Sequence, residues 1–231
     1  MNSTKKNKQE SEWDEYWKAN KKSPRRLYDI IASFYRRFLI KRSLNHFIFK
    51  YLKQGSSLLH AGCGSGQVDV DLKEKFNITA LDISENALIQ YKCFNGENSN
   101  VVQGNIFSMP FENKSFDGIY NLGVMEHFKE EEIRDIFKEF NRVLKQNGLM
   151  VIFWPPEYGL SVVFFKVLTF IYKNIFLKKQ VKFHPDEIKR IRSKKHAYSY
   201  MKISGFVPVS YSFGPRDLFT YSVLIAKKAD E

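Results

Sequence analysis

Short apolar runs alternate with amphipathic stretches through the middle of the chain. An apolar run of four to eight residues between turn residues favours a buried strand, and apolar residues three and four apart favour a helix. The pattern predicts five strands at about 57–61, 77–82, 100–103, 116–121 and 149–154. It predicts helices between them at about 66–75, 84–94 and 130–145. Strands that alternate with helices indicate an α/β fold with a mostly parallel, doubly wound sheet.

The flanking segments add helices before this core and helices and strands after it. Residues 11–20 place Trp13, Tyr16, Trp17 and Asn20 on one helical face, and Pro24 begins a second helical pattern that runs to about Lys53. Beyond strand five, a helix is predicted at about 185–203. Two strands are predicted within 206–226, with Gly214 and Pro215 between them. Residues 1–10 are polar and predict a disordered basic tail.

The predicted organisation is therefore one domain over residues 11–231. Its parts are an N-terminal helical cap (11–53), a core (54–156), a helical insertion that serves as a lid (157–203) and a final strand pair (204–231).

The chemistry-bearing pattern lies at the end of the first predicted strand. Gly62, Gly64 and Gly66 alternate directly after an apolar run, and Asp82 ends the next apolar run. Glycines allow a tight turn and a close backbone approach to a ligand, because no Cβ intervenes. A carboxylate one strand away can accept hydrogen bonds from two ribose hydroxyls. This arrangement predicts a nucleoside site. Gln67 stands where dinucleotide folds carry a third glycine, which disfavours a nicotinamide cofactor.

The residues 60–66, HAGCGSG, resemble motif I of the class I methyltransferases that use S-adenosylmethionine (SAM). Three further passages are similar to later family motifs at family spacing: GNIFSMPF at 104–111, SFDGIY at 115–120 and EFNRVLKQNGLM at 139–150. The resemblance covers about residues 57–154. It implies a seven-stranded Rossmann-like sheet, SAM as cofactor and no metal.

The resemblance also implies a set of cofactor contacts. Gly62, Cys63, Gly64 and Gly66 line the methionine part, Asp82 binds the ribose, Ile83 and Ile106 sandwich the adenine, and Asn121 and Leu122 approach the sulfonium. Two positions depart from the family pattern. His60 replaces an acid near the amino-acid moiety, and Asn105 replaces an aspartate near the adenine, so weaker cofactor binding is expected. An Asn oxygen still accepts a hydrogen bond.

His127 is the candidate catalytic residue. It lies in the passage Val124–Phe128, where many relatives carry Glu-His, and an imidazole can serve as general base near neutral pH. A structural role in the loop after strand four is the alternative.

Charge is distributed unevenly around a net value of +12. Residues 1–50 and 160–195 each carry a net charge of +8, whereas residues 51–159 carry −5. This indicates an anionic partner that binds the two basic segments rather than the acidic core. The stretch 160–177 is nearly all apolar, but Lys166 and Lys173 argue against a membrane span. A lid over the acceptor pocket, an interfacial helix on an anionic membrane (160–182) and ordinary core packing remain open.

Two cysteines and the absence of a secretory signal predict a cytoplasmic protein, with peripheral contact at the inner membrane face as one option. The expected function is SAM-dependent methylation of a small molecule, such as a lipid-linked or quinone-like acceptor. The alternatives are an RNA methyltransferase, which the basic blocks favour, and a catalytically idle SAM-binding or membrane-peripheral protein. No RNA-binding module is recognisable, so nucleic acid is the less favoured partner.

Overall fold

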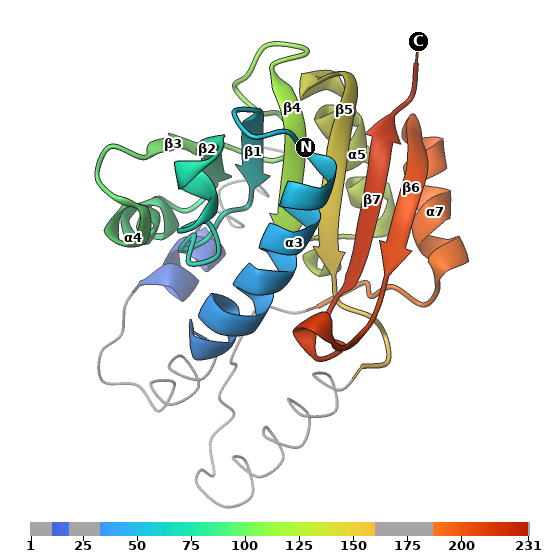
Figure 1. Ribbon diagram of the computed structural model, residues 1–231, viewed down its shortest axis with the longest axis horizontal. Helices are drawn as coiled ribbons and strands as arrows, with labels where there is room; N and C mark the ends of the chain where they lie inside the picture. Colours follow the sequence, from blue (N-terminus) through green and yellow to red (C-terminus); the bar gives the residue numbers. More distant parts are fainter. Residues whose placement is uncertain (1–10, 19–32, 160–186, 231) are drawn as a thin grey trace, which may run out of the picture.

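The computed structural model describes residues 11–18, 33–159 and 187–230. Seven strands form one sheet in the order β3-β2-β1-β4-β5-β7-β6 (Figure 1). The strands are β1 (Ser57–Ala61), β2 (Asn77–Asp82), β3 (Asn100–Gln103), β4 (Phe116–Leu122), β5 (Leu144–Trp154), β6 (Phe206–Ser212) and β7 (Ser222–Lys228). The first five are parallel, and β7 runs antiparallel to both of its neighbours. The predicted doubly wound, seven-stranded, mostly parallel α/β fold is confirmed.

Helices cover both faces of the sheet (Figure 1). One face carries the π-helical turn η1 (Arg36–Ile40), α3 (Lys41–Tyr51) and α4 (Glu85–Asn95); the other carries α5 (Glu130–Val143) and α7 (Lys194–Ile203). Leu44 and Ile48 of α3 pack with Tyr120 and Phe153 of the sheet, and all four are fully buried. The helix α3 therefore covers one face of β4 and β5.

The predicted helix at 66–75 is wrong. Residues 62–76 form successive turns with one 3-10 turn, η2 (Leu72–Glu74). Gly66 has φ +62°, and the following Val-Asp-Val-Asp sequence consists of weak helix formers. In addition, the Asp69 carboxylate is bound by His60 and Tyr91, which holds this segment against the core.

The boundary between α5 and β5 also differs from the prediction. The helix was expected to reach Lys145 and to stop at Gly148, but it ends at Val143, and β5 begins at Leu144. The Lys228 ammonium donates to the carbonyls of Asn141 and Leu144, at 2.7 and 3.1 Å, and so satisfies the end of the helix. A register shift in the β4–β5 pairing then accommodates the extra residues.

The predicted helix at 185–203 is shorter than expected. Residues 187–193 are not helical, because Ile191 pairs with Pro156 in a β-bridge. The helix α7 begins after Ser193, whose hydroxyl accepts from the backbone N–H of His196. Ser84 caps α4 in the same way, as predicted. The expected start of the second helix at Pro24, and residues 185–186, lie outside the described residues.

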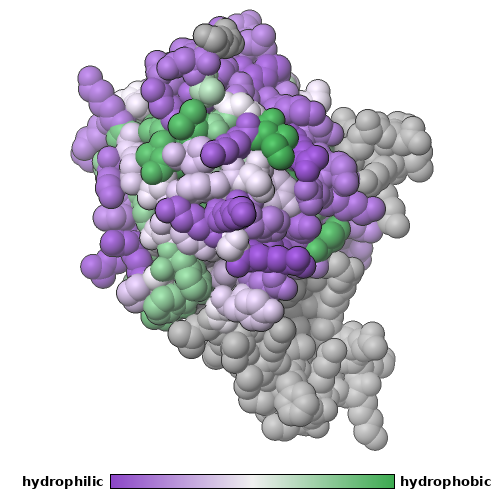
Figure 2. Space-filling view, turned by 90° about the vertical axis from the view of Figure 1, so that its right-hand side faces the viewer, coloured by the Kyte–Doolittle hydropathy of each residue, from purple (hydrophilic) through white to green (hydrophobic). Residues whose placement is uncertain are grey.

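The strand β6 forms one edge of the sheet. Its side of the molecule is mostly hydrophilic, with hydrophobic residues in small separate groups (Figure 2). Val207 and Val209 of this strand are about half exposed, and the pairing with β7 shifts between Pro208 and Ser210. Proline and an irregular ladder are common devices that protect an exposed edge strand.

Candidate active site

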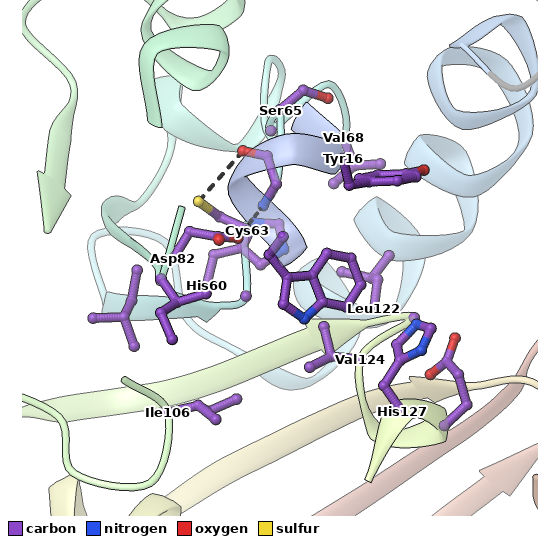
Figure 3. Close-up of a pocket in the computed structure, with 18 of the residues that line it drawn as sticks. Tyr16, His60, Cys63, Ser65, Val68, Asp82, Ile106, Leu122, Val124 and His127 are labelled. Carbon is purple, nitrogen blue, oxygen red and sulfur yellow. Dashed lines mark hydrogen bonds between the residues drawn. The ribbon is translucent and has the colours of Figure 1, made fainter. Parts of the chain in front are cut away.

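A cavity of about 310 Å³ opens where β1, β2 and β4 end. It is lined by the turn after β1, the ends of β2 and β4, and the helical residues 11–17 (Figure 3). His60, Cys63 and Asp82 lie together on one side, while Val124 and His127 lie on another (Figure 3). Ligands of open α/β sheets bind at this edge, so the cavity is the candidate active site.

The turn after β1 requires its glycines. Gly62, Gly64 and Gly66 have φ values of +73°, +51° and +62°. A Cβ on Gly64 would lie 2.6 Å from the ring of Trp17, and one on Gly66 would lie 2.2 Å from the ring of Tyr91. The loop backbone therefore lines the cavity with no room for side chains at these positions.

Asp82 lies at the end of β2 with its carboxylate against this turn. Oδ2 accepts from the backbone N–H of Gly64 at 2.8 Å, and Oδ1 accepts from that of Ser84 at 3.0 Å. Burial raises the pKa of Asp82, and these two hydrogen bonds oppose the rise. A carboxylate offers about four lone-pair sites, so acceptor capacity remains for a ligand in the cavity.

His60 lines the cavity but belongs to a buried network. Its Nδ1 lies 2.7 Å from Oδ2 of Asp69, which also accepts from the Tyr91 hydroxyl at 2.8 Å. The His60 ring packs on Tyr120, with centroids 4.4 Å apart. One nitrogen of His60 is thus committed to Asp69.

The expected adenine contacts line the cavity. Ile83, Asn105 and Ile106 are all in its wall. The side-chain oxygen of Asn105 accepts from the backbone N–H of Phe107 at 2.9 Å, so one lone pair is already used within the loop.

Asn121 and Leu122 separate at the end of β4. Leu122 lines the cavity, whereas Asn121 is fully buried, is not among the lining residues and donates its amide to the carbonyl of Ala61. Alternation along the strand puts the Asn121 side chain on the opposite face from that of Leu122, where its amide supports the turn after β1.

Cys63 is a packed, neutral thiol. It is 6% exposed, and its Sγ is 3.6 Å from the carbonyl of Gly64. Burial raises the pKa of the thiol well above its usual range, and the charges of Asp82 and Asp69 raise it further. A thiolate nucleophile is disfavoured at this position.

The helical residues 11–17 lie against the cavity and are anchored to α4. Oδ1 of Asp14 accepts from the Ser84 hydroxyl at 2.9 Å and from the Asn86 backbone at 3.2 Å, and Oδ2 accepts from the Asn86 amide at 2.7 Å. Trp13, Tyr16 and Trp17 all line the cavity. The sequence pattern placed these rings on one helical face of the N-terminal cap, and in the structure this face meets the cavity.

Glu126 and His127 lie in η3 (Met125–His127), directly after β4, and both line the cavity. The ring of His127 meets Trp13 edge to face, with centroids 5.0 Å apart. Glu126 is only 5% exposed, and burial raises its pKa to about 8. Sequence reasoning singled out His127 and missed Glu126, because nothing in the sequence indicated that this acid is buried.

A mostly parallel sheet with this strand order, a glycine turn after β1 and a carboxylate at the end of β2 define a nucleoside-binding methyltransferase fold. A model of the methyltransferase domain family matches residues 59–152. An uncharacterized protein of Methanocaldococcus jannaschii is 31% identical over 194 residues, which cover 75% of this chain and 72% of that protein.

Two named proteins extend the comparison. The demethylmenaquinone methyltransferase of Staphylococcus aureus is 30% identical over 142 residues, which cover 55% of this chain and 57% of that enzyme. A SAM-dependent methyltransferase structure from Methanosarcina mazei superposes with a TM-score of 0.62 at 19% identity, covering 80% of this chain and 98% of that one. The chain belongs to the class I SAM-dependent methyltransferases. It is an enzyme, and SAM is its cofactor.

Two further features concern the described ranges only. Among the residues that the structure describes, no three His, Cys, Asp or Glu side chains gather as they would around a metal ion. None of the helices in those ranges has the length and apolar character needed to cross a membrane. The stretch 160–182, expected to be a lid, a membrane contact or part of the core, lies entirely outside the described residues.

Proposed function

We propose that this chain methylates a lipophilic small molecule with a quinone-like ring, using SAM as the methyl donor. The observation that carries the proposal is the contrast between two parts of one cavity lining. Backbone groups of the glycine turn and the Asp82 carboxylate suit the polar cofactor. The aromatic side chains Trp13, Tyr16, Phe128 and Tyr221 suit a flat apolar ring.

The cofactor fits the polar part of the cavity. Asp82 retains acceptor capacity for ribose hydroxyls, and the turn carrying His60, Gly62, Cys63, Gly64 and Gly66 offers its backbone to the methionine part. Ile83, Asn105 and Ile106 would hold the adenine, and Leu122 would lie near the sulfonium. When bound, SAM supplies an electrophilic methyl group, whose S–C bond breaks with the electron pair staying on sulfur.

The remaining lining residues would position the acceptor. Holding two reactants in line lowers a barrier by roughly 7–11 kcal/mol, so a cavity that excludes water and orients a ring accounts for much of the catalysis. The relative from Staphylococcus aureus, named as a demethylmenaquinone methyltransferase, supports a quinone-like acceptor.

A lipid-tailed acceptor would also account for the basic, apolar stretch 160–182, which we propose contacts an anionic membrane surface. This would place a cytoplasmic enzyme peripherally at the inner face of the membrane. Flotation with vesicles that contain or lack anionic lipid tests the contact, and binding to neither would contradict it.

The acceptor is tested with purified protein, tritiated SAM and a short-chain demethylmenaquinol. We expect label in the organic phase with the wild type and none with Asp82→Asn, which lacks the ribose-binding charge. Exposed Asp135→Asn serves as the matched control. Binding of the demethylated product, S-adenosylhomocysteine (SAH), is measured by calorimetry on the same samples. No heat with SAH would contradict the cofactor site, whereas heat without labelled product would contradict this acceptor.

The two alternatives make different predictions in the same assay. An RNA methyltransferase would label added RNA, with binding that falls steeply as salt increases. A catalytically idle protein would bind SAH but label neither phase from a cell extract.

A further inference from the structure

Glu126 is a buried acid with one carboxylate oxygen that the fold does not use. It is 5% exposed and lines the cavity. Its Oε2 has no hydrogen-bond partner among the residues that the structure describes. Structural carboxylates in protein interiors are almost always hydrogen-bonded, so this oxygen needs another explanation.

The position of Glu126 is fixed by its backbone rather than by its side chain. Its carbonyl accepts from the backbone N–H groups of Ile188 and Lys189, at 2.6 and 3.0 Å. These bonds tie η3 to the segment after residue 187. The fold therefore fixes the residue through its main chain and leaves the carboxyl group to the cavity.

The carboxyl group lies near the end of β4. A Cβ added to Gly123 would lie 3.4 Å from Oε1 of Glu126 and 3.2 Å from the hydroxyl of Tyr221. Leu122, on the other side of Gly123, is the residue expected near the sulfonium. Glu126 is thus one short turn from the place where methyl transfer is expected.

The charge state of Glu126 can change near neutral pH. Burial raises its pKa to about 8; the charge of Glu187 raises it further, while the Arg190 charge and a hydrogen bond from its own backbone N–H lower it. The titratable and charged groups that face it or share its part of the cavity are His127, Glu187, Arg190, Tyr221 and Arg36. An acid with a pKa near the working pH is suited to exchange protons with a substrate.

We infer that Glu126 is the catalytic base, which takes the proton that the acceptor atom loses as that atom bonds to the transferred methyl carbon. The inference rests on the proposed function. The carboxylate becomes the neutral acid, the acceptor becomes the neutral methylated product, and the proton then passes to water. The acceptor is therefore a protic one, with the methylated atom carrying a hydrogen; a tertiary amine or a thioether is excluded.

The inference is tested without an acceptor by using sinefungin, a SAM analogue with an amine in place of the methyl group. Its ammonium should pair with the Glu126 carboxylate, so the wild type should bind sinefungin at least tenfold more tightly than SAH. At pH 7 most of Glu126 is protonated, so binding should release close to one proton. Calorimetry in buffers of different ionisation enthalpy measures that release.

Three variants make the result specific. In Glu126→Gln we expect the preference for sinefungin and the proton release to disappear while SAH still binds. The exposed Glu112→Gln is the control and should keep both, while His127→Asn tests the alternative assignment of the base. An unchanged preference in Glu126→Gln, or its loss only in His127→Asn, would overturn the inference. Failure of the wild type to bind SAH would instead overturn the cofactor site itself.

Turnover with the demethylmenaquinol gives a second readout. The wild-type rate should rise with pH and level off above about 8. Glu126→Gln should lose at least 100-fold in kcat and lose this rise, with little change in the affinity for SAH. A pH profile of the same shape in both proteins would contradict a base role for Glu126.

Discussion

The imidazole Nδ1 of His60 lies 2.7 Å from the carboxylate Oδ2 of Asp69, and both side chains are sealed from solvent. His60 occupies the position where the family usually carries an acid. The pair therefore places a carboxylate directly behind His60, nine positions later in the chain, although Asp69 itself does not line the cavity. An acid is thus still present next to residue 60, but it is Asp69, which the fold rather than the local motif brings there.

This pairing changes the expected result of restoring the family residue. In His60→Asp two carboxyl groups would share a buried site, and the contact between Nδ1 of His60 and Asp69 would be lost. A buried polar group left without its hydrogen-bond partner costs roughly 1–3 kcal/mol, and more when it is charged, so the urea midpoint should fall strongly. His60→Asn, which can still donate to Asp69, should lose less. Equal midpoints for the wild type and His60→Asp would mean that Asp69 is not tied to His60.

The contact between Gly64 and Trp17 predicts the effect of a single methyl group. Gly64→Ala would place a Cβ 2.6 Å from the ring of Trp17 and displace the helical residues 11–17. We expect SAH to bind at least tenfold more weakly by calorimetry.

The control for this change is Gly96→Ala, at φ +103° with no atom within 4 Å of the added Cβ. It introduces backbone strain without a steric contact and should leave SAH binding unchanged. Trp17→Ala combined with Gly64→Ala should recover part of the affinity. If the double variant binds no better than Gly64→Ala, the steric explanation is wrong.

Asp14 anchors the helical residues 11–17 to the N-terminus of α4. Asp14→Ala removes the acceptor for Ser84 and for both nitrogens of Asn86, and an acid is also favourable near a helix N-terminus. We expect release of residues 11–17, seen as faster proteolysis between Trp13 and Lys18 and a red shift of tryptophan emission. Glu15→Gln, at the exposed next position of the same helix, is the charge-matched control. Identical cleavage rates in the two variants would argue against the anchor.

Glu126 makes folding stability depend on pH. Its pKa rises from 4.5 to about 8 on folding, so the folded protein holds the proton more tightly than the unfolded chain. The stability from this group is fully present below pH 4.5 and is lost as the pH rises to about 8. Glu126→Gln does not titrate, so its melting temperature should exceed that of the wild type increasingly over this range.

One pKa unit corresponds to about 1.4 kcal/mol, so the difference at high pH is on the order of 5 kcal/mol. Thermal melts of both proteins from pH 5 to 9 measure it. Parallel curves would show that the carboxyl is not buried as described.

Local signals in the sequence determined much of the fold. Strand positions, the glycine turn, the Ser84 cap and Asp82 at the end of β2 all followed from apolar periodicity and turn chemistry, which depend only on neighbouring residues. Where a distant residue intervened, the prediction failed. Lys228 ends α5 early, and Ile191 pairs with Pro156 and so delays α7.

The amino-acid sequence by itself determined the fold class, the cofactor and the strand edge at which the cavity opens. Only the tertiary structure decided that Asp69 pairs with His60, that the rings of residues 13–17 line the cavity and that Glu126 is buried beside Tyr221. Each of these depends on packing between segments far apart in the chain. Burial and the electrostatic environment it creates are properties of that packing, and no local pattern of residue types encodes them.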